Sequence, residues 1–337
     1  MAWYNEIGAE SDVVVSSRIR FARNIAGYPF GKKLNDAGRS EIIDKVTKAL
    51  APAGLETIDL AAKNNIDTSV LAEKRYISSE FASEKAPHTL LLDESKQTAV
   101  MICGEDHVRI TAFSAGLSLK EAYDKAVALD DLLDAGVDIA YSESVGYLSQ
   151  NPTDLGTGMR ASLLLHLPAT ALARQIGAAE RGLAKLGVTM RAYFGESGEA
   201  YGSLYQISNS VTMGISEEEI IEKLINVAKQ LIESERKLRD TLKSDSFARL
   251  CDRVMRAKGL LTNAYLMSAS EFMGLWSDVR LGVSLGIVEG CDLAALDSLL
   301  VSAMPANLIA VSSSKADITA AELETLRAKT VRETLAK

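Results

Sequence analysis

The chain has 337 residues and a net charge of −8, because 45 Asp and Glu side chains outnumber 37 Lys and Arg. This length suggests about two domains. Hydrophobic residues make up 47% and charged residues 24% of the chain, which excludes a disordered or fibrous protein. The acidic balance argues against direct binding of nucleic acid and favours basic partners.

The three cysteines, Cys103, Cys251 and Cys291, lie far apart, with no CxxC pair and no histidine at metal-ligand spacing. We therefore expect a reducing, cytoplasmic setting. The N-terminal segment has neither the basic nor the apolar region of a secretory signal, and no apolar stretch approaches about eighteen residues. The sequence thus predicts a protein that does not span a membrane.

Strand and helix patterns alternate in the first part of the chain. In order, they predict a strand over 12–19, a helix over 40–50, a hairpin of strands over 88–92 and 98–110, a helix that begins with a Ser118–Glu121 capping box and ends at Gly136, and a helix from Pro168 to Gly187.

Two further strands, over 188–194 and 204–213, flank a glycine-rich loop, and a Ser216–Glu219 capping box then begins a long helix. After about residue 244 the pattern is helical throughout. The sequence therefore predicts an α+β domain built around an antiparallel sheet, residues 1–243, followed by an all-α domain, residues 244–337.

Five arginines stand within otherwise apolar or glycine-containing strands and turns: Arg18, Arg20, Arg109, Arg160 and Arg191. A planar guanidinium that keeps its charge suits bidentate binding of phosphate. Each arginine by itself is as well explained by a surface position or a salt bridge. Together they indicate a site for a polyphosphate.

Two carboxylates, Glu105 and Glu199, lie on a strand end and on the glycine-rich loop. If both faced the phosphate site, they could hold a guanidinium, whose N–H edges fit two carboxylates. Phosphoryl transfer to such a group depends mainly on alignment and charge neutralisation.

Other candidate motifs carry less weight. The turn Gly156-Thr157-Gly158 is a weak signal for an anion-binding loop, and the GxxxxGK[ST] phosphate-binding motif is absent. His88, His107 and His166 lack metal-ligand spacing, so we expect structural roles. No GxSxG, HExxH, HRD, DFG or GxGxxG signature points to hydrolases, zinc proteases, protein kinases of the eukaryotic type or dehydrogenases.

Taken in order, several stretches resemble the ATP:guanidino phosphotransferases, the family of arginine and creatine kinases. These stretches cover roughly residues 10–230: Val15 to Asn24, Glu105 to Ile110, Asn151 to Ser162 with Leu165 to Pro168, and Tyr205 to Asn209. The resemblance implies the family's antiparallel-sheet catalytic domain. It also implies transfer of a phosphoryl group from ATP to a guanidine, with Mg²⁺ bridging the phosphates.

The resemblance also assigns roles to residues. The arginines at positions 18, 20, 109, 160 and 191 would bind the nucleotide phosphates. Glu105 and Glu199 would orient the guanidinium, and one of them would act as the base. Asn151 stands where the family usually has a reactive cysteine beside the substrate.

Within this family, the chain is most similar to the bacterial protein-arginine kinases. Only 17 residues precede Arg18, where small phosphagen kinases have a helical domain, and the segment after about 245 resembles a dimerisation domain. The resemblance implies protein substrates rich in exposed arginine, a homodimer, and a link to a heat-shock repressor and the Clp protease machinery.

Three positions depart from the family pattern. Gly104 replaces the first carboxylate of the usual Asn-Glu-Glu-Asp-His, and Asn151 replaces the cysteine and so removes its thiolate. Only Arg327-Ala328 remains of a C-terminal Arg-Asp-x-x-Arg-Ala pattern that binds phosphoarginine in the family, so we do not expect allosteric activation by phosphoarginine.

Two alternatives stay open. One is a kinase of free arginine or another small guanidine. The other is a non-catalytic module that binds phosphoarginine or a nucleotide, which the changes at Gly104 and Asn151 would allow.

Overall fold

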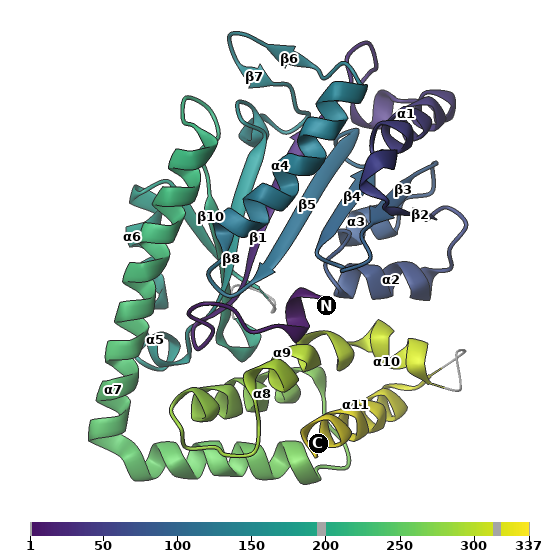
Figure 1. Cartoon of the computed structure of the whole chain (residues 1–337). Helices are drawn as coiled ribbons and strands as arrows, with labels where there is room; N and C mark the ends of the chain where they lie inside the picture. Colours follow the sequence, from purple (N-terminus) through teal and green to yellow (C-terminus); the bar gives the residue numbers. More distant parts are fainter. Residues whose placement is uncertain (1, 194–199, 313–317, 337) are drawn as a thin grey trace.

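A computed structural model describes residues 2–193, 200–312 and 318–336. An eight-stranded antiparallel sheet lies at its centre, in the order β2-β3-β4-β5-β1-β8-β10-β9 (Figure 1). Its strands are β1 (Val14–Arg23), β2 (Glu56–Asp59), β3 (Thr89–Leu92), β4 (Thr98–Ile102), β5 (Val108–Ala115), β8 (Met159–His166), β9 (Val188–Ala192) and β10 (Leu204–Asn209), and β6 (Tyr141–Ser142) pairs separately with β7 (Gly146–Tyr147).

Helices pack on both faces of this sheet, and the C-terminal part of the described chain is helical. The helices are α1 (Asp36–Ala49), α2 (Asn65–Glu73), α3 (Ser79–Ala82), α4 (Leu119–Gly136), α5 (Pro168–Leu172), α6 (Ile176–Lys185), α7 (Glu217–Asn263), α8 (Ala269–Ser284), α9 (Leu293–Ser302), α10 (Pro305–Val311) and α11 (Ala320–Leu335). The expected α+β class with a helical C-terminal region is confirmed.

Strand β1 is longer than predicted and runs to Arg23, so its arginines lie within the strand rather than after it. Because side chains alternate between the two faces of a strand, Ile19 and Phe21 point to one face while Arg18 and Arg20 point to the other. Arg23 falls on the apolar face, where it forms a buried ion pair with Asp130 of α4 at 2.7 Å.

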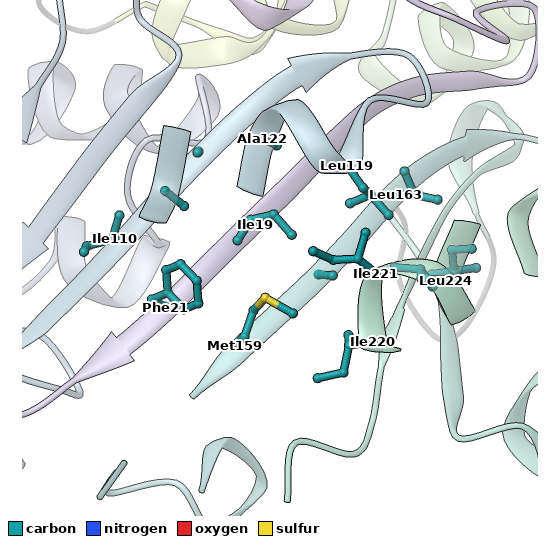
Figure 2. Packing of buried hydrophobic residues seen from close by; sticks show 14 of the residues in the cluster. Ile19, Phe21, Ile110, Leu119, Ala122, Met159, Leu163, Ile220, Ile221 and Leu224 are labelled. Carbon is teal, nitrogen blue, oxygen red and sulfur yellow. The ribbon is translucent and has the colours of Figure 1, made fainter. Parts of the chain in front are cut away.

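The apolar face of the sheet packs against α4 and the first half of α7, as Figure 2 shows. Ile19 and Phe21 are fully buried beneath these helices. Burying such side chains contributes roughly 1.5–3 kcal/mol each, which fixes the register of β1 and so the direction of its arginines. The other members of this contact in Figure 2 are Ile110, Leu119, Ala122, Met159, Leu163, Ile220, Ile221 and Leu224.

A second core joins the opposite face of the sheet to α2, α3 and the C-terminal helices. Leu164 and Leu204 of the sheet share this core with Phe272 and Trp276 of α8. Glu73, at the end of α2, accepts hydrogen bonds from the backbone N–H groups of Ala306 and Asn307 at 2.8 and 2.9 Å and so caps α10. The helical region is therefore held against the rest of the chain by both apolar packing and polar contacts.

The two predicted capping boxes have different outcomes. Ser216 and Glu219 form both reciprocal bonds at the start of α7, as predicted. Ser118 makes no capping bond with its side chain, so the box predicted for α4 is wrong. The Oγ of Ser17 accepts the Ser118 N–H instead, and Glu121 pairs with Lys125.

Two predicted elements are divided in the structure. The strand expected over 98–110 is two strands, because residues 103–107 form a turn in which Cys103 has φ 68° and its N–H bonds to the His107 carbonyl at 2.8 Å. The helix expected over 168–187 is interrupted at Arg174, whose φ of 57° ends α5 before α6 begins.

Helix α7 runs through the predicted domain boundary at 243–244. It contains a kink at Ser246, where φ is −144° and ψ is 30°. The division into residues 1–243 and 244–337 stays a prediction.

A buried charge network joins α8 and α9 to the N-terminal segment. Arg280 forms a two-bond ion pair with Asp297, at 2.8 and 3.1 Å, and donates to the carbonyls of Ser11 and Asp12. The same guanidinium donates to Nδ1 of His166, and Nε2 of that ring bonds to Ser277 at 2.8 Å. His166 therefore has the structural role predicted for it.

No single described helix is long and apolar enough to cross a bilayer. Helices α9 and α10 pass such a test only when taken together, and an 85° bend separates them.

We expect Asp297→Ala to lower the free energy of unfolding by about 3–5 kcal/mol, because it leaves the fully buried Arg280 without its carboxylate. Urea unfolding followed by circular dichroism measures this. The matched control is Glu333→Ala, which breaks an exposed pair with Lys329 and should leave stability unchanged. Equal effects of the two variants would contradict the prediction.

Candidate functional site

The pairing register of the sheet brings the five predicted arginines to one face. Arg20 lies opposite Arg160 of β8, and Arg109 of β5 lies opposite Ala22, two residues along from Arg20. Arg191 pairs with Gln206 of β10, which in turn pairs with Leu164, on the same face as Arg160. We call Arg18, Arg20, Arg109, Arg160 and Arg191 the arginine face.

A cavity of about 490 Å³ lies over this face and is lined by Arg18, Arg20, Arg160 and Arg191. We call it the arginine cavity. A second cavity of about 480 Å³ is lined by Arg20, Arg109 and Glu105, and we call it the Glu105 cavity. Since Arg20 lines both, the two cavities adjoin. Volumes of this size are typical of small-molecule sites.

The arginines differ in how far their charges are already neutralised. Arg109 pairs with Glu105 at 2.9 Å and with Asp106 at 3.3 Å, and Arg160 pairs with Asp154 at 2.7 Å. Among residues that the structure describes, Arg18 donates only to neutral groups, Ser162 at 3.2 Å and Gln206 at 3.0 Å.

Within the described part of the chain, neither Arg20 nor Arg191 has an ion pair or a side-chain hydrogen bond. The arginine face therefore carries an excess of positive charge with donors available for a ligand.

The pKa values of two arginines reflect this crowding. Burial, partly opposed by Tyr193 and reinforced by nearby arginines, lowers the pKa of Arg18 to about 10. Burial and the charges of Arg18, Arg109 and Arg160 lower the pKa of Arg20 well below its usual value. A bound polyanion relieves such repulsion, so the site is suited to phosphate.

Arg109 behaves in the opposite way. Burial by itself would lower its pKa, but the hydrogen bond to Glu105 and the charge of Asp106 raise it. Arg109 therefore links the arginine face to Glu105, the carboxylate that was predicted to be catalytic.

Glu105 stands in the turn between β4 and β5, and its side chain is 45% exposed. The turn is fixed by the buried Asp106, whose carboxylate accepts bonds from Asn24, Ser149 and the backbone N–H of Gln150. Asp106 thus ties the Glu105 turn to the end of β1 and to the segment that leads into Asn151.

Asn151 lines a smaller cavity of about 170 Å³ together with Glu105, Arg109 and Arg160. Its side-chain oxygen accepts bonds from the N–H and the hydroxyl of Thr153, and Thr153 in turn accepts a bond from Arg160. The position predicted to contact substrate is therefore part of the site, with its oxygen used in holding the local turn.

His107 helps to fix the turn between β4 and β5 that contains Glu105. Its Nδ1 accepts the Ile25 N–H at 3.0 Å, so the proton lies on Nε2, which donates to the Pro29 carbonyl at 3.1 Å. His88 is buried beside Phe81 with Nδ1 near the Ala86 carbonyl. Both roles are structural, as predicted.

The backbone of Gly156-Thr157-Gly158 is partly used in packing. The Thr157 N–H donates to the Thr212 carbonyl, and a Cβ at Gly158 would lie 2.7 Å from the Ala22 carbonyl. Gly158 also lines a cavity of about 170 Å³ together with Arg20 and Arg160. The weak anion-binding interpretation of this turn stays a prediction.

Glu199, the second predicted carboxylate, lies outside the described residues. The chain is described again from Ala200, and Gly202, with φ 69°, packs against α8 so closely that a Cβ there would lie 2.8 Å from the Met273 methyl group.

Sequence analysis missed Arg75, which follows α2 and also lines the arginine cavity. Its φ is 68°, uncommon for a residue with a Cβ, and its guanidinium lies 4.3 Å from the centre of the Tyr193 ring. No motif marks this position. It reaches the site only because α2 packs over the sheet.

Metal binding by the protein itself has no support in the described residues. They contain no group of three or more His, Cys, Asp or Glu side chains that could hold an ion. A Mg²⁺ ion held by nucleotide phosphates and water fits this site, since Mg²⁺ keeps several waters and needs few protein ligands.

Comparison with known proteins agrees with this geometry. The sequence profile "ATP:guanido phosphotransferase, C-terminal catalytic domain" matches residues 40–238, and "Protein-arginine kinase McsB C-terminal domain" matches residues 248–337. The "Protein-arginine kinase" of Desulforamulus reducens is 39% identical over 340 residues, which cover 99% of this chain and 95% of that protein. The chain belongs to the protein-arginine kinase family. A relative of the same name from Syntrophomonas wolfei is 40% identical over 343 residues, covering 99% of this chain and 95% of its own.

Solved structures share the fold at lower identity. The duplicated taurocyamine kinase of Schistosoma mansoni superimposes with a TM-score of 0.64 and 21% identity, covering 78% of this chain and 40% of that one. The match thus spans less than half of the duplicated protein. A lombricine kinase gives a TM-score of 0.60 at 23% identity, covering 70% of this chain and 69% of its own.

Arg327 and Ala328, which remain from the C-terminal Arg-Asp-x-x-Arg-Ala pattern, have structural roles in this chain. Arg327 is buried and donates to the carbonyls of Ala303 at 3.0 Å and Met267 at 2.9 Å, while Ala328 is fully buried. The guanidinium holds α11 against the neighbouring helices.

We expect His107 and His166 to titrate below an unfolded histidine, because burial lowers the pKa of both beneath 6.5. The unfolded chain then binds protons that the folded chain does not, so stability falls as the pH drops below about 6.5, by up to ~1.4 kcal/mol per pH unit for each histidine. NMR titration of the ring protons and urea unfolding at several pH values measure this. Midpoints at or above 6.5 would contradict it.

Proposed function

We propose that this protein transfers the γ-phosphoryl group of ATP to arginine side chains of other proteins. The observation that carries the proposal is the adjoining pair of cavities, one lined by Arg18, Arg20, Arg160 and Arg191 and the other by Arg109 and Glu105, with Arg20 shared between them. Phosphoryl transfer needs both a site that neutralises phosphate charge and an aligned acceptor.

The arginine face supplies the first requirement. Arg18 and Arg20 offer guanidinium groups without carboxylate partners among the described residues, and Arg160 and Arg191 line the same cavity. Bidentate bonds from these groups to the phosphate oxygens would hold ATP and stabilise the charge that develops on the transferred group. Mg²⁺, bound through the phosphates, would add further neutralisation.

Glu105 supplies the second requirement. Its position beside Arg109 places a carboxylate next to the phosphate-binding face, where it can accept a proton from the acceptor guanidinium. The guanidine nitrogen then forms the N–P bond while the bond between the γ-phosphorus and the bridging oxygen breaks, and ADP leaves. Glu199 stays a predicted second carboxylate for this step.

Several lines support a protein as the acceptor. The relatives from Desulforamulus reducens and Syntrophomonas wolfei carry the name protein-arginine kinase, and the net charge of −8 favours attraction of arginine-rich substrates. The same membership motivates the finer proposals of a cytoplasmic homodimer that acts on a heat-shock repressor and marks proteins for the Clp protease machinery.

We expect Arg20→Ala and Arg160→Ala each to weaken ATP binding by about tenfold or more, because a charge-assisted bond to phosphate is worth roughly 1.5–3 kcal/mol. Isothermal titration calorimetry with the non-hydrolysed Mg²⁺ complex of ATP measures this. Arg253→Ala, which breaks a surface pair with Asp278, is the control and should bind ATP normally. Unchanged affinity in both site variants would remove the arginine face from nucleotide binding.

We expect Glu105→Gln to lower kcat by about 10²-fold or more while ATP affinity stays within a few-fold, because loss of a general base acts on the transfer step. Acid-labile phosphoarginine on casein is the readout. Free arginine, assayed separately, tests the small-guanidine alternative. Binding of ATP without any phosphoarginine would instead favour a non-catalytic module, and full activity of Glu105→Gln would exclude Glu105 as the base.

A further inference from the structure

Glu80 stands at the junction of the two cavities. It lies on the short helix α3 and lines both the arginine cavity and the Glu105 cavity. Among the described residues that line the arginine cavity, it is the only carboxylate, and five arginines line the same cavity. A single negative charge at the boundary of a phosphate site and an acceptor site is an unusual placement.

The carboxylate of Glu80 is not used in holding the fold. Within residues 2–193, 200–312 and 318–336 it forms no ion pair and no side-chain hydrogen bond, whereas Glu105 is paired with Arg109 and Glu84 lies 3.5 Å from Arg39. Its side chain is exposed to the cavities. The charge is therefore available to a ligand.

Gly104 packs closely against the residue that follows Glu80. A Cβ at position 104 would approach the Phe81 ring to 3.2 Å, and Phe81 follows Glu80 directly on α3. Helix α3 therefore packs directly against Gly104, and the same helix carries Glu80, which lines the Glu105 cavity.

Electrostatics decides which ligand Glu80 binds. With a polyphosphate on the arginine face, an isolated carboxylate in the same cavity is repelled unless a cation lies between them. A guanidinium that enters past Glu105 supplies this cation and can donate to both carboxylates.

We propose that Glu80 binds the guanidinium of the acceptor arginine. This proposal rests on the proposed function, because it names the acceptor subsite of the same reaction. The Glu105 cavity is then the binding site for an arginine within a peptide, and α3 contributes to substrate specificity through Glu80.

Steady-state kinetics on the full-length protein tests the role of Glu80. We expect Glu80→Gln to raise KM for casein about tenfold or more without raising KM for ATP, and Glu80→Asp to recover part of the loss. Glu94→Gln, on the exposed turn between β3 and β4, is the matched control and should behave as wild type. A casein KM within twofold of wild type would overturn the proposal, as would a raised Mg²⁺ requirement with an unchanged casein KM, which would make Glu80 a metal ligand.

A binding measurement separates this proposal from the proposed function. Calorimetry with ADP, Mg²⁺ and the blocked tripeptide Ala-Arg-Ala, compared with its citrulline counterpart, needs no turnover. We expect wild type to prefer the arginine peptide by about tenfold and Glu80→Gln to lose that preference. An unchanged preference in Glu80→Gln overturns the role of Glu80, whereas the absence of phosphoarginine formation by wild type counts against the proposed function.

Discussion

The alternation of side chains along β1 is the constraint on which the site depends. Burial of Ile19 and Phe21 beneath α4 and α7 leaves Arg18 and Arg20 no direction except the opposite face. A shift of β1 by one residue would bring guanidinium groups into the apolar core. The hydrophobic energy that stabilises one face of the sheet therefore also maintains the positive charge on the other.

This positive charge persists because, in the part of the chain that the structure describes, few carboxylates neutralise it. Arg109 and Arg160 have acidic partners, but among the described residues Arg18 is bonded only to neutral side chains. Burial lowers its pKa, and the neighbouring arginines lower it further. The free protein thus bears a repulsion that a polyanionic ligand removes. Pre-organised donors of this kind do not have to be rearranged when the reaction begins.

Much of this site could be predicted because it lies on strands. Apolar neighbours mark Arg18 and Arg109 as parts of predicted strands, whereas the first predicted strand ended before Arg20 and no strand was predicted around Arg160 of β8. The resemblance to a known family implied the roles of all four. Arg75 and Glu80 could not be found in this way. Arg75 stands just after α2, and Glu80 stands on the short helix α3. No periodicity in these segments shows which side chain faces the sheet, and only tertiary packing brings the two residues to the arginine cavity. The missing α4 capping box has a similar cause, since Ser17, distant in sequence, accepts the Ser118 N–H.

The second core has a consequence for how this chain can be divided. Leu164 and Leu204 of the sheet are covered by Phe272 and Trp276 of α8, and Arg280 binds carbonyls near the N-terminus. Cutting the polypeptide within α7 would expose the apolar residues of the second core on both fragments. It would also separate the buried Arg280 from the carbonyls of Ser11 and Asp12. The helical region is therefore no detachable appendage, and evolution could gain or lose it only together with compensating changes on the sheet.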